Sequence, residues 1–410
     1  MSVIVQKYGG SSVADVQKIG IVADRVVAAK RAGHDVVVVV SAMGKTTDGL
    51  IELARRAAEA EGAGVEPPRR GLDMLVSTGE RVTMALLSIA IHARGHDAIS
   101  FTGSQSGILT NDRHFDARII EVRPHRIQDE LARGRIVIVA GYQGMSDKRE
   151  ITTLGLGGSD TTAVALAAAL AAERCEIYSD VDGVYSADPR VVTDPKHLPE
   201  MDLSVLGEMA EAGAKVLNAQ AVEWARRSKI VIHARKTSDP LGGGRQTLAR
   251  PHASDGEDGE IARAADENRN VRAIVGIGNV MFARIARASL PLFLSTAAGE
   301  EVSVGDVVAT GDDALVHLPL LNMPDWPRCA RALEAALGGA GKLLGTRAVV
   351  SVVGYGLTGA SGALSRTLEA LSRIDIVPQC ISAGPLRIRA NIDESQLGDA
   401  QRAPHAVFVG

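Results

Sequence analysis

The chain has 410 residues, enough for roughly two to four domains, and 46% of its residues are hydrophobic. It carries 45 lysines and arginines against 49 aspartates and glutamates, and this net charge of −4 argues against a dedicated nucleic-acid binder. The three cysteines are widely spaced, so neither a disulfide framework nor a zinc cluster is expected. The first residues lack the apolar run of a signal peptide, and the apolar stretch 163–172 is too short to span a bilayer. We therefore expect a cytoplasmic protein that does not associate with a membrane.

The first 250 residues alternate short β-branched runs with alanine-rich stretches. Strands are predicted at 3–6, 36–40, 136–140 and 176–179, and helices at about 13–32 and 160–170. The unbroken valine run at 36–40 is typical of a strand that is buried on both faces of a parallel sheet. This alternation indicates an α/β fold with a mainly parallel sheet, in which ligands bind beyond the carboxyl ends of the strands.

The composition changes near Arg250. Residues 251–270 are acidic and polar and are expected to form a linker. Beyond them, the short sequence Ile274–Gly278 recurs 78 residues later as Val352–Gly356, and a helix-like stretch follows each copy. This spacing predicts two small α+β modules, although a chance match is the alternative.

Two glycine-containing segments follow early strands. Gly44-Lys45-Thr46 suggests a P-loop, but that motif needs a further glycine where this chain has Val39, so we reject this interpretation. The segment Lys7–Ser12 lies between the first predicted strand and the first predicted helix. Paired glycines allow backbone N–H groups to approach phosphate oxygens, and a lysine beside them supplies a positive charge. The alternative is an ordinary tight turn with an exposed lysine.

Two later segments are also unusually polar. Residues 152–162 combine glycines with hydroxyl side chains ahead of an alanine-rich helix, which is more than capping by Asp160 requires. We therefore expect ligand contact at the start of this helix. Residues 179–190 contain the turn signals Asp-Gly and Asp-Pro, but a turn alone does not require Tyr185 or Arg190. The family resemblance described next is what leads us to interpret this segment as a loop on the nucleotide side of a site.

Seven segments in this order resemble the amino-acid kinase family, and within it the aspartokinase branch: Lys7–Val13, Ser41–Asp48, Ser77–Glu80, Gly141–Gly144, Thr152–Thr162, Ser179–Arg190 and Gly213–Leu217. The resemblance covers nearly the whole chain. It implies a three-layer αβα kinase domain at 1–250 and, after the linker, degenerate ACT-like modules at 271–341 and 342–410. ACT modules are small regulatory α+β units, and the resemblance implies a homodimer that forms through them.

The resemblance also implies a reaction, the transfer of the γ-phosphoryl group of ATP to the side-chain carboxylate of L-aspartate, which gives aspartyl 4-phosphate. A carboxylate is already an adequate nucleophile, so positioning and charge neutralisation can supply most of the catalysis. ATP and Mg²⁺ are the expected cofactors. The histidines show no metal-binding spacing, so Mg²⁺ is expected to arrive with the nucleotide and not in a protein cage.

The resemblance assigns roles to individual residues. Lys7 would stabilise the transferred phosphoryl group, Asp160 would organise Lys7, and Glu80 would pair with the ammonium group of aspartate. The other nucleotide contacts would come from Gly9, Gly10, Ser11, Ser179, Asp180, Tyr185 and Arg190. The other amino-acid contacts would come from Ser41, Thr47, Gly158 and Ser159.

The chain departs from the family pattern at Leu156, where an arginine usually binds a carboxylate of aspartate. Loss of such a buried charged hydrogen bond costs about 2–5 kcal/mol. Arg149 or Arg81 could replace the arginine, the acceptor could be a different amino acid, or the protein could be a weak or non-catalytic, ligand-binding relative. In a later segment, Lys236 could touch phosphate, but a solvated lysine is equally expected.

Overall fold

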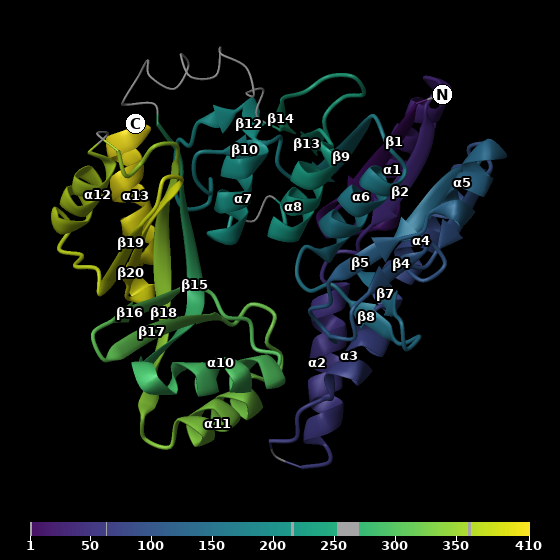
Figure 1. The fold of residues 1–410 in the computed structure, drawn as a ribbon. Helices are drawn as coiled ribbons and strands as arrows, with labels where there is room; N and C mark the ends of the chain where they lie inside the picture. The colour runs from purple at the N-terminus through teal and green to yellow at the C-terminus, as the bar shows by residue number, and fades with distance from the viewer. Residues whose placement is uncertain (1, 63, 215–216, 252–269, 360–361) are drawn as a thin grey trace. The chain divides into compact units, whose positions relative to one another are not determined.

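The computed structural model describes residues 2–410 except 63, 215–216, 252–269 and 360–361 (Figure 1). The chain forms two compact units. The first contains most of the described chain as far as Pro251, and the second contains Tyr185–Lys196, Glu211–Ala214 and the described residues from Asn270 onward. Nearly all of the predicted linker at 251–270 lies outside the described residues. The predicted division into 1–250, 271–341 and 342–410 stays a prediction.

An eight-stranded sheet forms the centre of the first unit, in the order β12-β14-β13-β9-β1-β2-β6-β3. Its neighbouring strands are parallel except for β13 and β14. The strands are β1 (Val3–Tyr8), β2 (Asp35–Val40), β3 (Ala98–Phe101), β6 (Ile136–Ala140), β9 (Arg174–Ser179), β12 (Glu200–Asp202), β13 (Ile232–Lys236) and β14 (Gln246–Arg250). The four strands predicted from sequence are confirmed, and the five valines at 36–40 are all fully buried.

Helices cover both faces of this sheet, which confirms the predicted three-layer α/β architecture. On one face, α1 (Val16–Arg31) and α4 (Thr78–His92) share a core with alternate residues of β1, β2 and β6. Side chains of the intervening positions point to the opposite face, where α6 (Gly158–Ala169) packs on β1, β2 and β9. The remaining helices of this unit are α2 (Thr46–Glu59), α3 (Arg69–Val76), α5 (His125–Ala132), α7 (Leu203–Glu211) and α8 (Ala219–Ser228).

The first helix begins three residues later than its sequence predicts. Gly10–Val13 forms a short 3-10 helix, η1, and Asp15 then caps α1 by accepting a hydrogen bond from the Lys18 N–H at 2.8 Å. An aspartate that caps a helix lies outside it, so α1 starts at Val16.

Within the described part of the chain, residues 69–92 form a stretch that could cross a membrane by length and composition alone. This stretch is α3 followed by α4. It contains two buried acidic residues, Asp73 and Glu80, and α4 packs on β2, β3 and β6. These features are typical of helices in a protein core.

A second, four-stranded sheet belongs to the first unit and was not predicted. Its order is β5-β4-β7-β8, formed by Ile119–Val122, Ile108–Thr110, Gln143–Ser146 and Ile151–Thr153. Two further strands, β10 (Val184–Tyr185) and β11 (His197–Leu198), have only two residues each.

The second unit is built on an antiparallel sheet in the order β16-β17-β15-β18-β20-β19. Helices α10 and α11 share one core with β15 and β17, and α12 and α13 share another with β15, β18 and β20. The two copies of the sequence repeat pair with each other, because Ile274 in β15 lies opposite Val352 in β18. An α+β tandem is therefore confirmed.

The elements of this unit are β15 (Val271–Ala286), η2 (Arg287–Ser289), α10 (Leu290–Gly299), β16 (Val307–Thr310), β17 (Asp313–Pro319), α11 (Trp326–Leu337), β18 (Gly341–Gly354), α12 (Ala363–Ser372), β19 (Cys380–Ala383), β20 (Arg387–Ile392), η3 (Glu394–Gln396) and α13 (Leu397–Phe408).

Candidate active site

The predicted site residues of the first unit gather where strands β1, β2, β6 and β9 end. The segments after these strands are tied to one another through the backbone. Gly9 N–H donates to the Tyr178 carbonyl at 3.1 Å, and Gly141 N–H donates to the Val40 carbonyl at 3.0 Å. This is the edge of a parallel sheet at which ligands usually bind.

Lys7 and Asp160 form a buried ion pair at this edge. Lys7 is the last residue but one of β1, and its Nζ lies 2.6 Å from Oδ1 of Asp160 in the first turn of α6. Both residues are less than a tenth exposed. This ion pair is compatible with the expectation that Asp160 organises Lys7, and the catalytic roles of both residues stay predictions. Because removing two charges from water is costly, a buried pair at the mouth of a sheet is more readily explained by function than by stability.

The glycine turn lies beside this ion pair. A Cβ at Gly9 would be 3.5 Å from the Lys7 Nζ, so the ammonium group lies against the turn. The Gly9 N–H is already donated to a backbone carbonyl, so its predicted contact with phosphate would require that hydrogen bond to break. Gly10 packs against the segment that follows β2, because Gly44 N–H donates to the Gly10 carbonyl at 3.0 Å. Ser11 follows in η1 and is exposed.

Gly10→Ala should disrupt this turn. A Cβ at position 10 would lie 2.9 Å from the Ala42 carbonyl oxygen and 3.0 Å from that of Gly44, so backbone would have to move. We expect a loss of kcat/KM of about tenfold or more, since small displacements at a reacting centre cost that much. Gly49→Ala in α2 is the matched control, because a Cβ there meets nothing within 4 Å. A coupled assay of ADP release compares the two, and equal activities would contradict the proposed role of the turn.

The glycines before α6 allow the helix to begin close to its neighbours. Gly157 has a left-handed backbone (φ 76°), and a Cβ there would lie 2.9 Å from the Cβ of Asn218. A Cβ at Gly158 would lie 2.6 Å from the Cβ of Leu154. The side chain of Asn218 also donates to the Leu156 carbonyl at 2.6 Å. Close packing therefore explains part of the glycine content that suggested a ligand site. Ser159 is buried beside Gly141.

Glu80 is a buried carboxylate that lacks a complete set of partners. It lies in the first turn of α4, and its Oε1 accepts a hydrogen bond from the Ala42 N–H at 3.1 Å. Its Oε2 is buried without a hydrogen-bond partner among the described residues. Burial raises the pKa of this carboxyl to about 7. Because an unpaired buried acceptor is costly, the free oxygen is suited to receive a cation such as a substrate ammonium group.

Two other predicted amino-acid contacts, Ser41 and Thr47, follow the end of β2 in the chain. Ser41 directly follows β2, and Thr47 is the second residue of α2. Leu156 is 59% exposed. Of the two arginines that could replace its missing charge, Arg149 is exposed, whereas Arg81 directly follows Glu80 and is half-buried.

The predicted nucleotide contacts are divided between the two units. Ser179 ends β9, its hydroxyl bonds with the Val181 backbone, and Asp180 beside it is exposed. Tyr185 and Arg190 belong to the second unit, and Arg190 donates to Asp188 at 2.8–3.0 Å. In the Gly213–Leu217 motif, residues 215–216 lie outside the described residues.

Thr237 was not predicted as a site residue. It connects strand β9, the 3-10 helix η1 and helix α1 at the site edge. Its N–H donates to the Ser179 carbonyl at 2.9 Å, and its hydroxyl lies 2.6 Å from that of Ser12 in η1. Its carbonyl accepts a hydrogen bond from Nε of Arg25 in α1 at 2.8 Å. The charge of the neighbouring Lys236 is the more conspicuous feature of this segment in the sequence.

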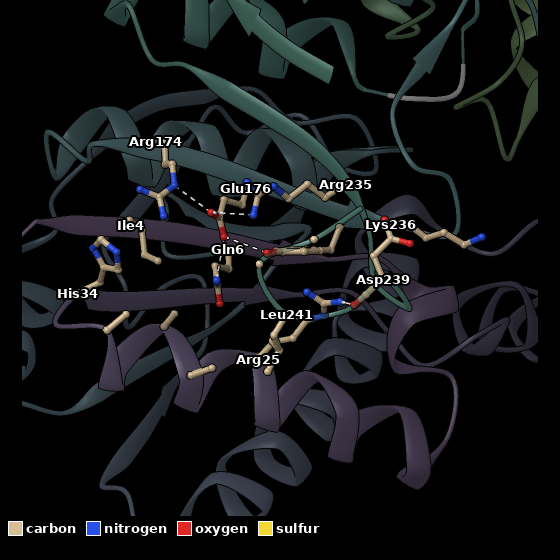
Figure 2. Close-up of a pocket in the computed structure, with 16 residues that line it drawn as sticks. Ile4, Gln6, Arg25, His34, Arg174, Glu176, Arg235, Lys236, Asp239 and Leu241 are labelled. Carbon is tan, nitrogen blue, oxygen red and sulfur yellow. Dashed lines mark hydrogen bonds and ion pairs between the residues drawn. The ribbon is translucent and has the colours of Figure 1, made fainter. Parts of the chain in front are cut away.

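Arg25 lines a pocket of about 250 Å³ on the α1 face of the sheet (Figure 2). The pocket has a buried carboxylate, Glu176, near its centre. Glu176 accepts hydrogen bonds from Gln6 at 2.9 Å and from Arg174 at 2.8 Å, and these contacts lower its pKa despite its burial. The hydrogen bond from Gln6 to Glu176 links β1 to β9.

Comparison with known proteins identifies the family of this chain. The model of the amino acid kinase family matches residues 2–235. The aspartokinase of Mycolicibacterium smegmatis is 40% identical over 420 residues, which cover 100% of this chain and 96% of the relative. Among solved structures, E. coli aspartokinase III in complex with aspartate and ADP aligns over 100% of both chains with a TM-score of 0.85 at 24% identity. Aspartate kinase from Synechocystis aligns over 99% of this chain and 69% of its own, with a TM-score of 0.54 at 31% identity. A family model that spans more than half of the chain, together with full-length relatives, shows that the chain belongs to the amino acid kinase family.

Proposed function

We propose that this protein transfers the γ-phosphoryl group of ATP to the side-chain carboxylate of L-aspartate. The observation that carries the proposal is the buried Lys7–Asp160 pair beside the glycine turn. The full-length relative at 40% identity is named aspartokinase, and the structure at TM-score 0.85 is a complex with aspartate and ADP. These names support aspartate as acceptor and ATP as donor.

In the proposed reaction, a carboxylate oxygen of aspartate attacks the γ-phosphorus, the bond to the β–γ bridging oxygen breaks, and ADP leaves. Lys7 would stabilise the charge on the transferred group, and Asp160 would keep Lys7 in place. Oε2 of Glu80 would accept a hydrogen bond from the ammonium group of aspartate. The attacking carboxylate is already ionised at neutral pH, so no general base is required.

Mg²⁺ would supply further neutralisation of the phosphate charges. The described residues contain no group of three or more His, Cys, Asp or Glu side chains that could hold a metal ion. Mg²⁺ that is bound mainly by phosphate oxygens and water would not require a protein cage, and Asp160, the carboxylate that pairs with Lys7, is the residue that we propose would lie near it. We further propose a cytoplasmic location and a homodimer formed through the second unit, as the family resemblance implies.

ADP release with aspartate and a panel of related amino acids tests the proposed function. We expect turnover with aspartate at saturating Mg-ATP. Turnover only with another amino acid would show a changed acceptor. No turnover with any carboxylate-bearing amino acid, together with binding of nucleotide or amino acid in calorimetry, would support a non-catalytic ligand-binding relative instead.

Leu156→Arg should improve the use of aspartate. The exposed Leu156 side chain has no donor for a substrate carboxylate, and a charged hydrogen bond would be worth about 1.5–3 kcal/mol, or roughly ten- to a hundredfold in kcat/KM. Leu156→Lys provides a control of equal charge without the guanidinium fork. Steady-state kinetics at varied aspartate check the prediction. A lower kcat/KM for the arginine variant would mean that leucine is matched to another acceptor.

A further inference from the structure

The pocket on the α1 face of the main sheet is separate from the Lys7–Asp160 pair. Its residues all belong to the first unit, and they come from the neighbouring strands β1, β9 and β13, from α1 and from the segment after β13. Gln6 of β1 lines the pocket. Because side chains alternate along a strand, the neighbouring Lys7 points to the opposite face of the sheet, where it pairs with Asp160. The sheet therefore lies between the pocket and this ion pair.

Three arginines from different elements surround one buried carboxylate in this pocket. Figure 2 shows Arg174 of β9 and Arg235 of β13 on either side of Glu176, with Arg25 approaching from α1. The guanidinium carbon of Arg25 lies 5.3 Å from the centre of the Tyr178 ring. The side chains of Arg174 and Arg235 are 21% and 31% exposed, so both can be reached from solvent.

Positive charge is in excess around the pocket. Three arginines face one glutamate, and Lys236 and Asp239, which also line the pocket, add one charge of each sign. With His34 counted as neutral, the lining residues carry two more positive than negative charges. Glu173 pairs with Arg174 from outside the pocket, and this leaves at least one positive charge without a partner. An anionic ligand would therefore be attracted to this pocket.

Glu176 has no remaining capacity to bind a cation, because both of its oxygens are engaged. Its Oε1 accepts from Nε of Arg174 at 2.8 Å and lies 3.6 Å from Nη1 of Arg235. Its Oε2 accepts from Nε2 of Gln6 at 2.9 Å and from the Tyr178 hydroxyl at 3.1 Å. The carboxylate therefore holds the arginines in place and is not itself a site for a ligand.

The arginines retain N–H groups that a ligand can use, since a guanidinium group carries five of them. Arg174 donates through Nε to Glu176 and through Nη1 to Glu173, and its Nη2 has no hydrogen-bond partner among the residues that the structure describes. Arg235 donates through Nε to Gln246 at 2.7 Å. The forked shape of a guanidinium group matches the oxygens of a carboxylate or a phosphate.

One wall of the pocket is apolar. Ala28 and Ala29 of α1, and Ala32 directly after it, line the pocket together with Arg25. These positions lie three, four and seven residues after Arg25, which is the spacing of one helix face. The small methyl side chains leave room beside the arginines, and a carbon skeleton can pack against them.

We propose that this pocket binds a small organic anion, a phosphate or carboxylate group on a short carbon skeleton. Arg174 and Arg235 would bind the anionic oxygens, and the alanines of α1 would contact the carbon atoms. The volume of about 250 Å³ is slightly below the range of about 300–1,000 Å³ that is typical of sites for larger ligands, so it suits a small metabolite. The inference goes beyond the proposed function and does not depend on it, because neither arginine is among the predicted kinase contacts.

Isothermal titration calorimetry of the full-length chain with two probes tests the proposal. Glycerol 3-phosphate carries a phosphate group and glutarate carries carboxylates, so the pair distinguishes the two kinds of ligand. We expect one of them to bind with a Kd below about 1 mM. The matched small anion, inorganic phosphate or acetate, should bind at least about fourfold more weakly, because one buried CH₂ group is worth about that much.

Two variants should weaken binding in different ways. Arg174→Gln removes a charged hydrogen-bond donor and should raise the Kd about tenfold or more. Ala28→Leu keeps every charge but fills the space beside the arginines, and it should prevent binding by steric overlap. Arg94→Gln is the matched control, because Arg94 is also a partly exposed arginine and pairs with Asp24 at 2.6 Å, but does not line the pocket. Thermal unfolding shows whether each variant is folded.

Weaker binding in Arg174→Gln and in Ala28→Leu, with unchanged affinity in Arg94→Gln, would support the proposal. Failure of both probes to bind at up to about 10 mM, ten times the expected limit of the Kd, would overturn it. Wild-type affinity in folded Ala28→Leu would also overturn it, since the probe would then lie elsewhere. The ADP-release assay tests the proposed function separately, so each of the two can fail without the other.

Discussion

Lys7→Ala should lower kcat by at least about a hundredfold, the usual effect of removing one preorganised charge from a transition state. Lys7 is the buried cation at the mouth of the sheet, and its ammonium group lies against the glycine turn. The substitution also leaves Asp160 unpaired, which should cost about 3–5 kcal/mol in stability. Kinetics should therefore be measured at a temperature at which the variant is folded, as judged by thermal unfolding.

Lys30→Ala is the matched control for this prediction. Lys30 also pairs with an aspartate, because its Nζ lies 2.9 Å from Oδ1 of Asp35, and both side chains are largely buried. This pair lies where β2 begins, at the opposite edge of the sheet from Lys7. We expect Lys30→Ala to change kcat by less than about threefold. A Lys7→Ala variant that is folded and retains a similar kcat would contradict the assigned role.

Glu80→Gln should raise the KM for aspartate by roughly thirtyfold or more, because a desolvated charged hydrogen bond is worth about 2–5 kcal/mol. The amide retains the shape of the side chain but loses the charge that would pair with the substrate ammonium group. The KM for ATP should change little. Steady-state kinetics at varied aspartate measure the effect.

The pKa of Glu80 adds a test by pH. Burial raises this pKa to about 7, so the carboxyl loses its proton only as the pH rises through neutrality. The ionised form is the one that binds the ammonium group, so the KM for aspartate should rise about tenfold between about pH 8 and pH 6. Glu80→Gln should remove this dependence.

Glu130→Gln provides the control for the Glu80 predictions. Glu130 is also buried, but it pairs with Arg133 and Arg135, which lower its pKa. Its replacement should leave the KM for aspartate and its pH dependence unchanged. A pH-independent KM in the wild-type protein would count against a role for Glu80 in substrate binding.

The principal sheet could be predicted because its central strands are strongly patterned. The five-valine run of β2 and the apolar run of β6 are fully buried on both faces, which gives an unmistakable composition. The four-stranded second sheet was missed because its strands have only three or four residues and include polar ones such as Gln143 and Thr152. Such short strands depend on tertiary pairing and leave little periodicity to detect.

The link between Lys7 and Asp160 was expected from the family resemblance, and composition and spacing alone did not pair the two residues. Thr237 was not predicted, because a threonine that serves through its backbone and hydroxyl has no pattern of its own. The attachment of Tyr185–Lys196 to the second unit could not be predicted either, since it depends on single contacts such as that between Ser186 and His405. Long-range contacts of this kind require the fold.

The most direct measurement is to trap the product. An acyl phosphate reacts with hydroxylamine to give a stable hydroxamate. The wild-type protein is therefore incubated with Mg-ATP, aspartate and hydroxylamine. The product is identified by mass spectrometry and by comparison with two standards, the hydroxamates of the side-chain carboxyl and of the α-carboxyl group of aspartate. We expect the side-chain hydroxamate of aspartate, formed in step with ADP and nearly absent with Lys7→Ala. Release of ADP without any hydroxamate, or hydroxamate formed at an undiminished rate by folded Lys7→Ala, would contradict carboxylate phosphorylation at this site.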